Sequence, residues 1–369
     1  MRKSILAAAC AALLAVPAVQ AREFKARSAD GTEIAGAADM PDKTWTTAVV
    51  FVPGTGLFDR DGQLGRSGTP RDALFKDLAA RLIARGVAAV RYDLRGVRHG
   101  VPPAEMLDKA LLAGRTTDNM RDDLAAVYGW TRSAGGLNAR CTVFFAHSEG
   151  MLHVARLAPA GAPAPALIIG MGAAMESPAA TLRWQVTGRD ADSLEQMDAD
   201  KNGITTNDEV KANLQRTPSG VHGVLEPFLH PSGQWTAADI AELRKTQSAV
   251  YEKYRAETLS QADTDPYPNV NTPFSAFQWW KSWFVDEVAA GTNLSKWAVP
   301  VILHYGDLDS QTPAALQTVS AKTHIPADRL SIQIHAGRGH SLGPDVLFGP
   351  IEEAIADRIA DQAAAAVCK

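Results

Sequence analysis

The 369-residue sequence predicts an α/β protein with a mostly parallel, doubly wound sheet and an inserted helical segment. Short apolar runs typical of buried strands alternate with stretches whose apolar residues recur at helical spacing. Such alternation favours a parallel sheet that is covered by helices on both faces. Between residues 175 and 296 the alternation stops, and the sequence becomes polar, helix-like and interrupted by prolines.

The expected elements follow in order along the chain. Residues 23–38, divided by Asp30-Gly31, predict a hairpin. The segment 72–85 carries Leu74, Leu78 and Leu82 at helical spacing and ends at a glycine. Strands are expected at residues 47–52, 87–92, 141–145, 166–169, 300–305 and 330–334, and helices at 72–85, 117–131, 151–157 and 351–367.

The interruption defines the expected domain organisation. Residues 22–174 and 297–369 are expected to form the α/β domain, and residues 175–296 a helical lid inserted between two of its strands. An independent second domain is the alternative for the inserted segment. Five of the eight tryptophans lie in it: Trp184, Trp235, Trp279, Trp280 and Trp283.

Residues 1–21 predict a cleaved secretory signal peptide. Arg2 and Lys3 precede an apolar run, and small residues lie at Val19 and Ala21, before the expected cleavage site. A lipid anchor at Cys10 is the weaker alternative, because it needs a branched apolar residue three positions earlier, where Ala7 stands. No other segment reaches the ~18 apolar residues of a membrane span. We therefore expect a periplasmic or secreted protein without a membrane anchor.

Charge and cysteine content limit the partners and the compartment. Cleavage removes two of the 37 basic residues, which leaves 35 against 41 acidic residues and a net charge of −6. This balance does not indicate nucleic acid or a membrane surface as a partner. Cys141 and Cys368 remain after cleavage. They can pair in an oxidising compartment or stay separate thiols, and the sequence leaves both possibilities open.

The most informative motif is Phe-Ala-His-Ser-Glu-Gly at residues 145–150. A strand ends there, a helix begins at once, and Ser148 occupies the apex of the turn. A strand-to-helix turn this tight requires small residues two positions before and after the apex, and Ala146 and Gly150 meet that need. The turn exposes the serine hydroxyl and directs the next backbone N–H toward the group that it attacks.

A nucleophilic serine needs a histidine to take its proton and a carboxylate to orient the histidine. In a doubly wound hydrolase these partners follow later strands, with the acid before the histidine. Asp309 follows the strand at 300–305 and His340 follows the strand at 330–334, so we predict a triad of Ser148, Asp309 and His340. Other candidates are expected to be structural: Asp307 as a loop cap, and His335 and His147 as buried or strand histidines.

The oxyanion that forms in such a reaction needs two backbone N–H donors. The Glu149 N–H is the first, because it follows the serine. Residues 51–56, Phe-Val-Pro-Gly-Thr-Gly, end a strand in glycines, and we predict the Thr55 N–H as the second. An ordinary glycine–proline turn is the alternative interpretation.

Several strings recur in a set order along the chain. They are P-G-T-G-L-F-D-R-D-G at residues 53–62, R-Y-D-L-R-G at 91–96, A-H-S-E-G at 146–150, W-W-K-S-W-F at 279–284 and G-D-L-D-S-Q-T-P at 306–313. This set resembles bacterial α/β-hydrolase esterases that are related to serine aminopeptidases. The resemblance covers roughly residues 47–158 and 297–342.

The resemblance implies an α/β-hydrolase fold. It implies the triad of Ser148, Asp309 and His340, with Thr55 and Glu149 at the oxyanion hole. The chain departs from the pattern at Pro53, which is usually histidine, and at Ala146 and Met151, where glycine is usual or frequent. These changes affect the oxyanion loop and the packing of the turn, so they bear on rate and substrate more than on reaction class.

The lid sequence contains a pattern typical of calcium-binding loops. Residues 198–209, D-A-D-K-N-G-I-T-T-N-D-E, match all twelve positions of an EF-hand loop, and a solvated acidic loop is the alternative. The apolar residue usual at position eight stands at seven, so Asp208 is an alternative to Glu209 as the closing ligand. Residues 228–239 resemble a degenerate partner loop without early ligands. The expected calcium ligands are Asp198, Asp200, Asn202, the backbone carbonyl of Ile204, and Glu209.

These patterns predict an exported serine hydrolase that cleaves small-molecule carboxylic esters through an acyl-enzyme intermediate. A calcium-stabilised lid is expected, and no organic cofactor. A serine exopeptidase is one alternative, and a calcium-responsive binding protein with an inert hydrolase domain is another. The sequence determines neither the natural substrate nor the oligomeric state.

Overall fold

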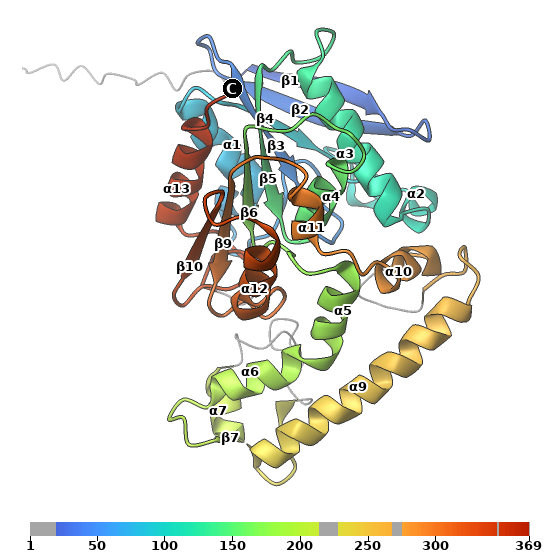
Figure 1. Ribbon diagram of the computed structural model, residues 1–369, viewed down its shortest axis with the longest axis vertical. Helices are drawn as coiled ribbons and strands as arrows, with labels where there is room; N and C mark the ends of the chain where they lie inside the picture. Colours follow the sequence, from blue (N-terminus) through green and yellow to red (C-terminus); the bar gives the residue numbers. More distant parts are fainter. Residues whose placement is uncertain (1–19, 214–227, 268–274, 345–346, 369) are drawn as a thin grey trace, which may run out of the picture.

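The computed structural model describes residues 20–213, 228–267, 275–344 and 347–368. A mixed eight-stranded sheet forms the centre of the molecule (Figure 1). The predicted signal peptide, residues 1–21, lies almost entirely outside the described residues. In the order in which they lie side by side, the strands are β1 (Gln20–Arg27), β2 (Glu33–Met40), β4 (Ala88–Tyr92), β3 (Thr47–Val52), β5 (Cys141–His147), β6 (Leu167–Met171), β9 (Val301–Gly306) and β10 (Leu330–His335).

Most neighbouring strands run parallel. The predicted hairpin is present as the antiparallel pair β1–β2, and β2 is also antiparallel to β4. All other neighbours, from β4 to β10, are parallel. Every residue of β5 is buried between β3 and β6. The structure therefore confirms the predicted sheet, and it brings the end of β5 to the middle of the carboxyl edge.

Helices cover both faces of the sheet, as the alternation predicts. On one face lie α1 (Leu74–Ala84) and α13 (Glu353–Ala364), whose apolar sides meet residues of β3 and β5 in one core. The other face is covered by α3 (Thr117–Arg132), α4 (Gly150–Leu157), α11 (Ala290–Leu294) and α12 (Ala314–His324). A short helix, α2 (Lys109–Ala113), precedes α3. The central strands are therefore buried on both faces, which is what a parallel sheet requires.

The inserted segment connects β6 to β9, two neighbouring strands of the sheet. It divides into two parts. Helix α10 packs on the main core through Trp279 and Trp283, whereas α6, α7 and the start of α9 enclose a small core of their own that includes Trp235 (Figure 1). The elements of the segment before α11 are α5 (Pro178–Thr187), α6 (Arg189–Met197), β7 (Ile204–Thr206), α7 (Asn207–Ala212), β8 (Gln234–Thr236), α9 (Ala237–Ser260) and α10 (Phe277–Phe284).

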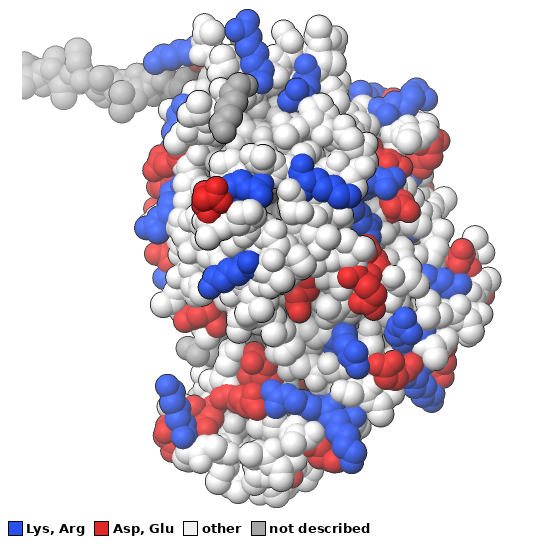
Figure 2. All heavy atoms as spheres, in the orientation of Figure 1, with Lys and Arg blue, Asp and Glu red and all other residues white. Residues whose placement is uncertain are grey.

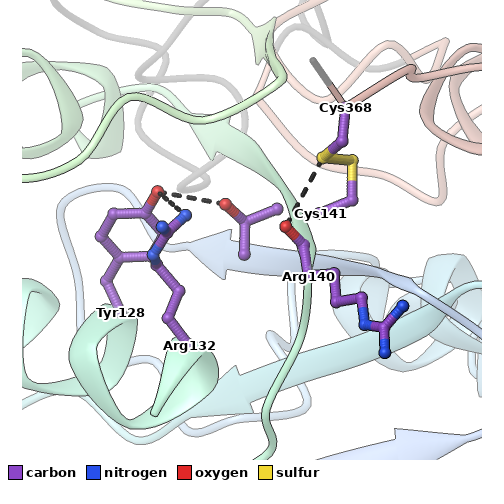
Figure 3. Close-up of a disulfide and its surroundings, with 6 residues drawn as sticks. Tyr128, Arg132, Arg140, Cys141 and Cys368 are labelled. Carbon is purple, nitrogen blue, oxygen red and sulfur yellow. Dashed lines mark hydrogen bonds between the residues drawn. A yellow bond between two sulfur atoms is a disulfide. The ribbon is translucent and has the colours of Figure 1, made fainter.

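The structure pairs the two cysteines whose state the sequence leaves open. Cys141 at the start of β5 and Cys368 near the end of the chain form a disulfide, with their Cα atoms 5.4 Å apart (Figure 3). That separation lies within the range that a disulfide spans. The bond therefore fixes the segment after α13 beside the first residue of the central strand, at the end of the sheet opposite Ser148.

Buried ion pairs explain why three arginines and Asp93 stand in the strings D-R-D-G and R-Y-D-L-R-G. Both Nε and Nη2 of Arg60 donate to Asp93, at 3.1 and 2.8 Å. Arg95 makes the same type of pair with Asp123, at 2.9 and 2.6 Å. These pairs, with that of Arg91 and Asp39, join the hairpin, the loop after β3 and the turn after β4. The motif therefore holds the loops that surround the site.

The face of the molecule displayed in Figure 2 carries charges of both signs. Figure 2 shows acidic and basic side chains interspersed over the face that it displays, including the surface of the insertion. Among the described residues, no helix combines the length and the apolar character that a membrane crossing needs.

Candidate active site

Ser148 lies at a sharp turn between β5 and α4, with a φ of +54° that non-glycine residues rarely adopt. Its backbone N–H donates to the carbonyl of Met171 at 2.9 Å, which ties the turn to the end of β6. A Cβ at Gly150 would lie 2.4 Å from the carbonyl oxygen of Val52. Only glycine therefore allows α4 to begin this close to the end of β3, as the motif predicts.

Asp309 and His340 lie together at the carboxyl edge of the sheet. The Nδ1 of His340 is 2.9 Å from Oδ2 of Asp309, and both side chains are buried. The other carboxylate oxygen of Asp309 accepts from the backbone N–H groups of Gln311 and Thr312, at 2.8 and 3.0 Å. The aspartate is thus fixed by its own loop and holds the imidazole with Nε2 directed away from it.

Two further residues, which the sequence did not single out, fix the imidazole. The hydroxyl of Thr312 lies 2.9 Å from Asp309, 3.2 Å from His340 Nδ1 and 2.8 Å from the carbonyl of Gly172. A Cβ at Gly172 would lie 2.8 Å from His340 Nδ1, so the residue after β6 makes room for the ring. The signal for Thr312 was its place three residues after the acid, where a hydroxyl reaches back to cap the loop.

The serine and the histidine both contact the end of β6, the strand that lies beside β5. Ser148 is tied to Met171, and His340 rests against the adjacent Gly172. Within the described residues the Ser148 hydroxyl makes no hydrogen bond to His340. Catalytic hydrogen bonds of this kind often shorten only when substrate is bound.

The competing candidates occupy other positions. The carboxylate of Asp307 is exposed and accepts from the backbone N–H of Gly337 at 2.7 Å, as a loop cap does. His335 ends β10 and lies 3.0 Å from His304, away from the acid. His147 is buried, but its ring centroid lies only 5.0 Å from that of His340. Burial, with His340 nearby, lowers the pKa of His147 well below its usual range, so this ring is neutral.

The two predicted oxyanion donors lie on the same cavity. Thr55 and Glu149 both line a space of about 150 Å³ beside the turn. Within the described residues, neither backbone N–H donates to another group of the protein. The loop after β3 lies directly against the turn, because a Cβ at Gly54 would be 2.8 Å from Cβ of Ser148. Two unpaired donors beside a strained serine are the arrangement that an oxyanion hole needs.

The side chain of Glu149 has a role that the sequence did not reveal. It is almost fully buried, and its two oxygens are shared between the hydroxyl of Thr55 and Nε2 of His153, the latter at 2.8 Å. The carboxylate therefore joins the helix after the serine to the loop that carries the second donor. The only sequence signal was the spacing of Glu149 and His153, four residues apart on one face of α4.

The residues of the predicted calcium loop also come together. Carboxylate oxygens of Asp198, Asp200 and Glu209 lie within 4.8 Å of one another. The backbone N–H groups of Asn202 and Gly203 donate to Asp198, at 3.1 and 2.8 Å. Although desolvation opposes them, these hydrogen bonds hold the pKa of Asp198 below its usual range. Backbone donors do the same for the pKa of Glu209, so both carboxylates are ionised at neutral pH.

The frame of this loop is intact. Asp208 has a side chain that is 93% exposed and pairs with Lys211, whereas Glu209 turns back onto the loop through Ala199 N–H at 3.0 Å. Position eight is Thr205, which is buried and donates its hydroxyl to the carbonyl of Leu194 at 2.8 Å. The apolar residue at position seven therefore does not mark a deletion, and Glu209 rather than Asp208 faces the other carboxylates.

The degenerate loop at residues 228–239 is the structural partner of this loop. Strands β7 and β8 pair antiparallel, with Thr205 opposite Trp235, so the two loops meet at equivalent positions. In the second loop, Asp239 caps α9 by accepting from the backbone N–H of Thr236 at 2.9 Å. A shared core lies beneath both loops and consists of Ala191, Leu194, Met197, Val210, Phe228, Trp235 and Ile240.

Comparisons with known proteins establish the fold. No family model and no curated protein matches the sequence. Among solved structures, the chain is similar to the α/β hydrolase GrgF from Penicillium sp. sh18, at 14% identity over 93% of this chain and 98% of that one, with a TM-score of 0.50. An esterase from Rhodococcus sp. ECU1013 matches at 17% identity over 94% and 99%, with a TM-score of 0.49. Together with the strand order, the likeness to the hydrolase defines an α/β-hydrolase fold.

Replacing Thr55 by valine should test the link between Glu149 and the loop that carries the predicted oxyanion donor. Thr55→Val keeps the backbone N–H and the side-chain shape but removes the hydroxyl that anchors the loop. We expect kcat to fall, by at most the ~10²-fold that loss of one oxyanion donor costs, with little change in KM. Steady-state kinetics on a p-nitrophenyl ester provide the measurement.

Thr55→Ser is the matched variant, because it retains the hydroxyl and should regain most of the lost kcat. Equal kcat values for wild type and Thr55→Val would show that the hydroxyl only fills space.

Proposed function

We propose that the protein is an exported serine hydrolase that cleaves carboxylic esters of small molecules through an acyl-enzyme intermediate. The observation that carries this proposal is the buried pair of Asp309 and His340, 2.9 Å apart, at the same edge of the sheet as the strained Ser148. The two unpaired N–H groups of Thr55 and Glu149 beside this serine add the donors that acyl transfer requires.

The proposed reaction has two halves. Ser148 Oγ attacks the ester carbonyl carbon while His340 Nε2 takes its proton, and the N–H groups of Thr55 and Glu149 stabilise the oxyanion. The C–O bond to the alcohol then breaks, and the departing oxygen takes the proton from His340. In the second half, water gives its proton to His340 and attacks the acyl-enzyme, and Ser148 recovers a proton as the acid is released. Asp309 holds the imidazole throughout and stabilises its charged form.

The resemblance to serine aminopeptidases makes an exopeptidase the alternative activity, and we propose ester cleavage as the favoured one. An exopeptidase needs a free carboxylate to hold the substrate's amino terminus. Glu149 is the carboxylate on the cavity wall, and both of its oxygens already have partners in Thr55 and His153. That engagement favours an ester substrate over a peptide with a free amino group.

We also propose that the loop at residues 198–209 binds one Ca²⁺ ion. Three carboxylates within 4.8 Å are a donor set that suits this hard cation, with Asn202 and the carbonyl of Ile204 as the remaining protein ligands. The calcium would neutralise the mutual repulsion of these carboxylates and hold α6 and α7 together. The role of the ion in this proposal is structural, and the partner loop would bind none.

The contacts of α6 and α5 support a link between the calcium loop and the catalytic acid. Helix α6 ends at Met197, directly before Asp198, and begins at Arg189, whose guanidinium lies 3.4 Å from Oε1 of Gln311. Gln185 on α5 donates to the carbonyl of the same glutamine at 3.3 Å. Gln311 follows Asp309 by two residues. In this proposal the inserted segment acts as a lid. Calcium would order α6 and thereby hold the lid in place against the loop that carries Asp309.

The proposed activity can be tested with an active-site probe and a substrate panel. A fluorophosphonate should label the wild type but not Ser148→Ala, and p-nitrophenyl esters should be cleaved faster than aminoacyl-anilides. Ser148→Ala should retain less than about one thousandth of the wild-type rate, because the nucleophile is lost. Asp309→Asn should lower kcat by ~10²-fold or more, because the histidine loses its orientation.

Asp307→Asn is the matched control for the acid, two residues away in the same loop, and should have a mild effect. Absence of probe labelling would favour the inert binding protein, whereas faster cleavage of anilides would favour the exopeptidase. Equal damage from the two aspartate variants would contradict the assignment of Asp309.

Calcium should stabilise the protein and affect substrate binding more than turnover. A ligand that binds only the folded state at a hundredfold excess over its Kd stabilises it by about 2.7 kcal/mol. We therefore expect a higher Tm with Ca²⁺ than with a chelator, a larger change in KM than in kcat, and one site per chain by calorimetry.

Asp198→Ala combined with Asp200→Ala should abolish the effects of calcium on Tm and on KM, as should Glu209→Gln. Asp208→Asn is the control and should bind calcium normally. If the wild type binds no Ca²⁺ at millimolar concentration, the proposal is wrong and the loop is only a solvated turn.

Export is the final part of the proposal. The Cys141–Cys368 disulfide supports an oxidising compartment such as the periplasm or the extracellular medium. We expect the mature protein to begin at Arg22 and to carry no lipid, which the intact mass of exported material measures. A different start, or the mass of an acyl group on Cys10, would contradict this expectation.

A further inference from the structure

The cavity beside Ser148 is small and well defined. It has a volume of about 150 Å³. The oxyanion loop and the residue after the serine form one side of it, and apolar side chains form most of the rest. The residues that line it are Gly54, Thr55, Gly56, Leu57, Leu94, Leu112, Arg115, Met120, Glu149, Ser275 and Trp279.

The position of the cavity identifies the part of the substrate that enters it. Its lining residues come from the loop after β3, the turn after β4, the α2–α3 region, the turn before α4, and the α10 region. None of them belongs to the loops after β9 and β10, which carry Asp309 and His340. A departing alcohol must take its proton from His340, so the alcohol lies toward the histidine. The acyl group is then the part directed into the cavity.

Four of the side chains that line the cavity are packed in the core. Leu94, Leu112 and Met120 are each at most 5% exposed, and Trp279 on α10 is 7% exposed. Side chains packed in a core at this density do not move aside without cost. Arg115 strengthens the wall further by donating to the carbonyl oxygens of Gly56 and Arg95, each at 2.9 Å. The size of the acyl group is therefore limited by the volume that the structure already contains.

We infer that the substrates are esters of small acids, with an acyl group that is a short aliphatic chain or a single aromatic ring. A cavity of about 150 Å³ is large enough for benzene. A long fatty acyl chain does not fit in this space and would have to displace Trp279 or Met120. This inference rests on the proposed function, and it gives that function a substrate class.

A series of p-nitrophenyl esters tests the inference on the full mature protein. The butyrate and benzoate esters should be cleaved with a kcat/KM ~10²-fold above that of the octanoate ester, since pocket contacts discriminate on that scale. Trp279→Leu should raise the ratio of octanoate to butyrate by ~10-fold, because it opens the far wall. Met120→Ala opens a different wall of the cavity and should also raise the ratio of octanoate to butyrate cleavage. It replaces Trp279→Leu in the test if that variant fails to fold.

Leu124→Ala is the matched control, since it removes a buried side chain one turn further along α3 that does not line the cavity. It should lower Tm without changing the preference for acyl length. Wild-type cleavage of octanoate as fast as butyrate would overturn the inference, as would an unchanged ratio in both cavity variants. If fluorophosphonate labels Ser148 but acyl length has no effect, only the inference fails. If no ester is cleaved and no label forms, the proposed function fails and the inference with it.

Discussion

The site depends on one constraint, the close approach of three backbone turns at the carboxyl edge of the sheet. The turn after β5 carries Ser148, and no Cβ fits at Gly54 of the neighbouring loop, at Gly150 of the helix start or at Gly172 after β6 without a contact of 2.8 Å or less. The missing side chain at each glycine leaves room for a different part of the structure: the loop after β3, the first turn of α4 and the imidazole of His340. The strained φ of Ser148 persists because these surroundings hold it on every side.

Two buried carboxylates flank this turn, and their partners give them different roles. Oδ1 of Asp309 accepts from N–H groups of its own loop, and Oδ2 contacts the Thr312 hydroxyl and orients His340. Glu149 is divided between Thr55 and His153, so it positions a loop rather than a proton acceptor. Burial makes an unpaired charge costly, and full pairing makes each carboxylate a fixed point in the site.

The insertion reaches the site from two directions. Helix α10 lines the cavity beside Ser148 through Trp279, and α5 and α6 contact Gln311, two residues after Asp309. The paired loops at β7 and β8 lie at the other end of α6 and have their own small core. Helix α6 therefore connects that core directly to the loop that carries Asp309, and a change in the order of the core is transmitted along this one helix.

Sequence by itself determined the order of strands and helices, because apolar periodicity and glycine turns are local properties that hold before the chain folds. It also singled out Ser148, Asp309 and His340, since each follows a strand whose end meets the same edge of a parallel sheet. Only the tertiary structure decided that Glu209 rather than Asp208 faces the other carboxylates of the loop at residues 198–209, and that Cys141 meets Cys368. It alone revealed Thr312, Gly172 and the side-chain role of Glu149. Those features depend on which side chains meet across segments distant in sequence, and such meetings are set by the packing of the whole molecule.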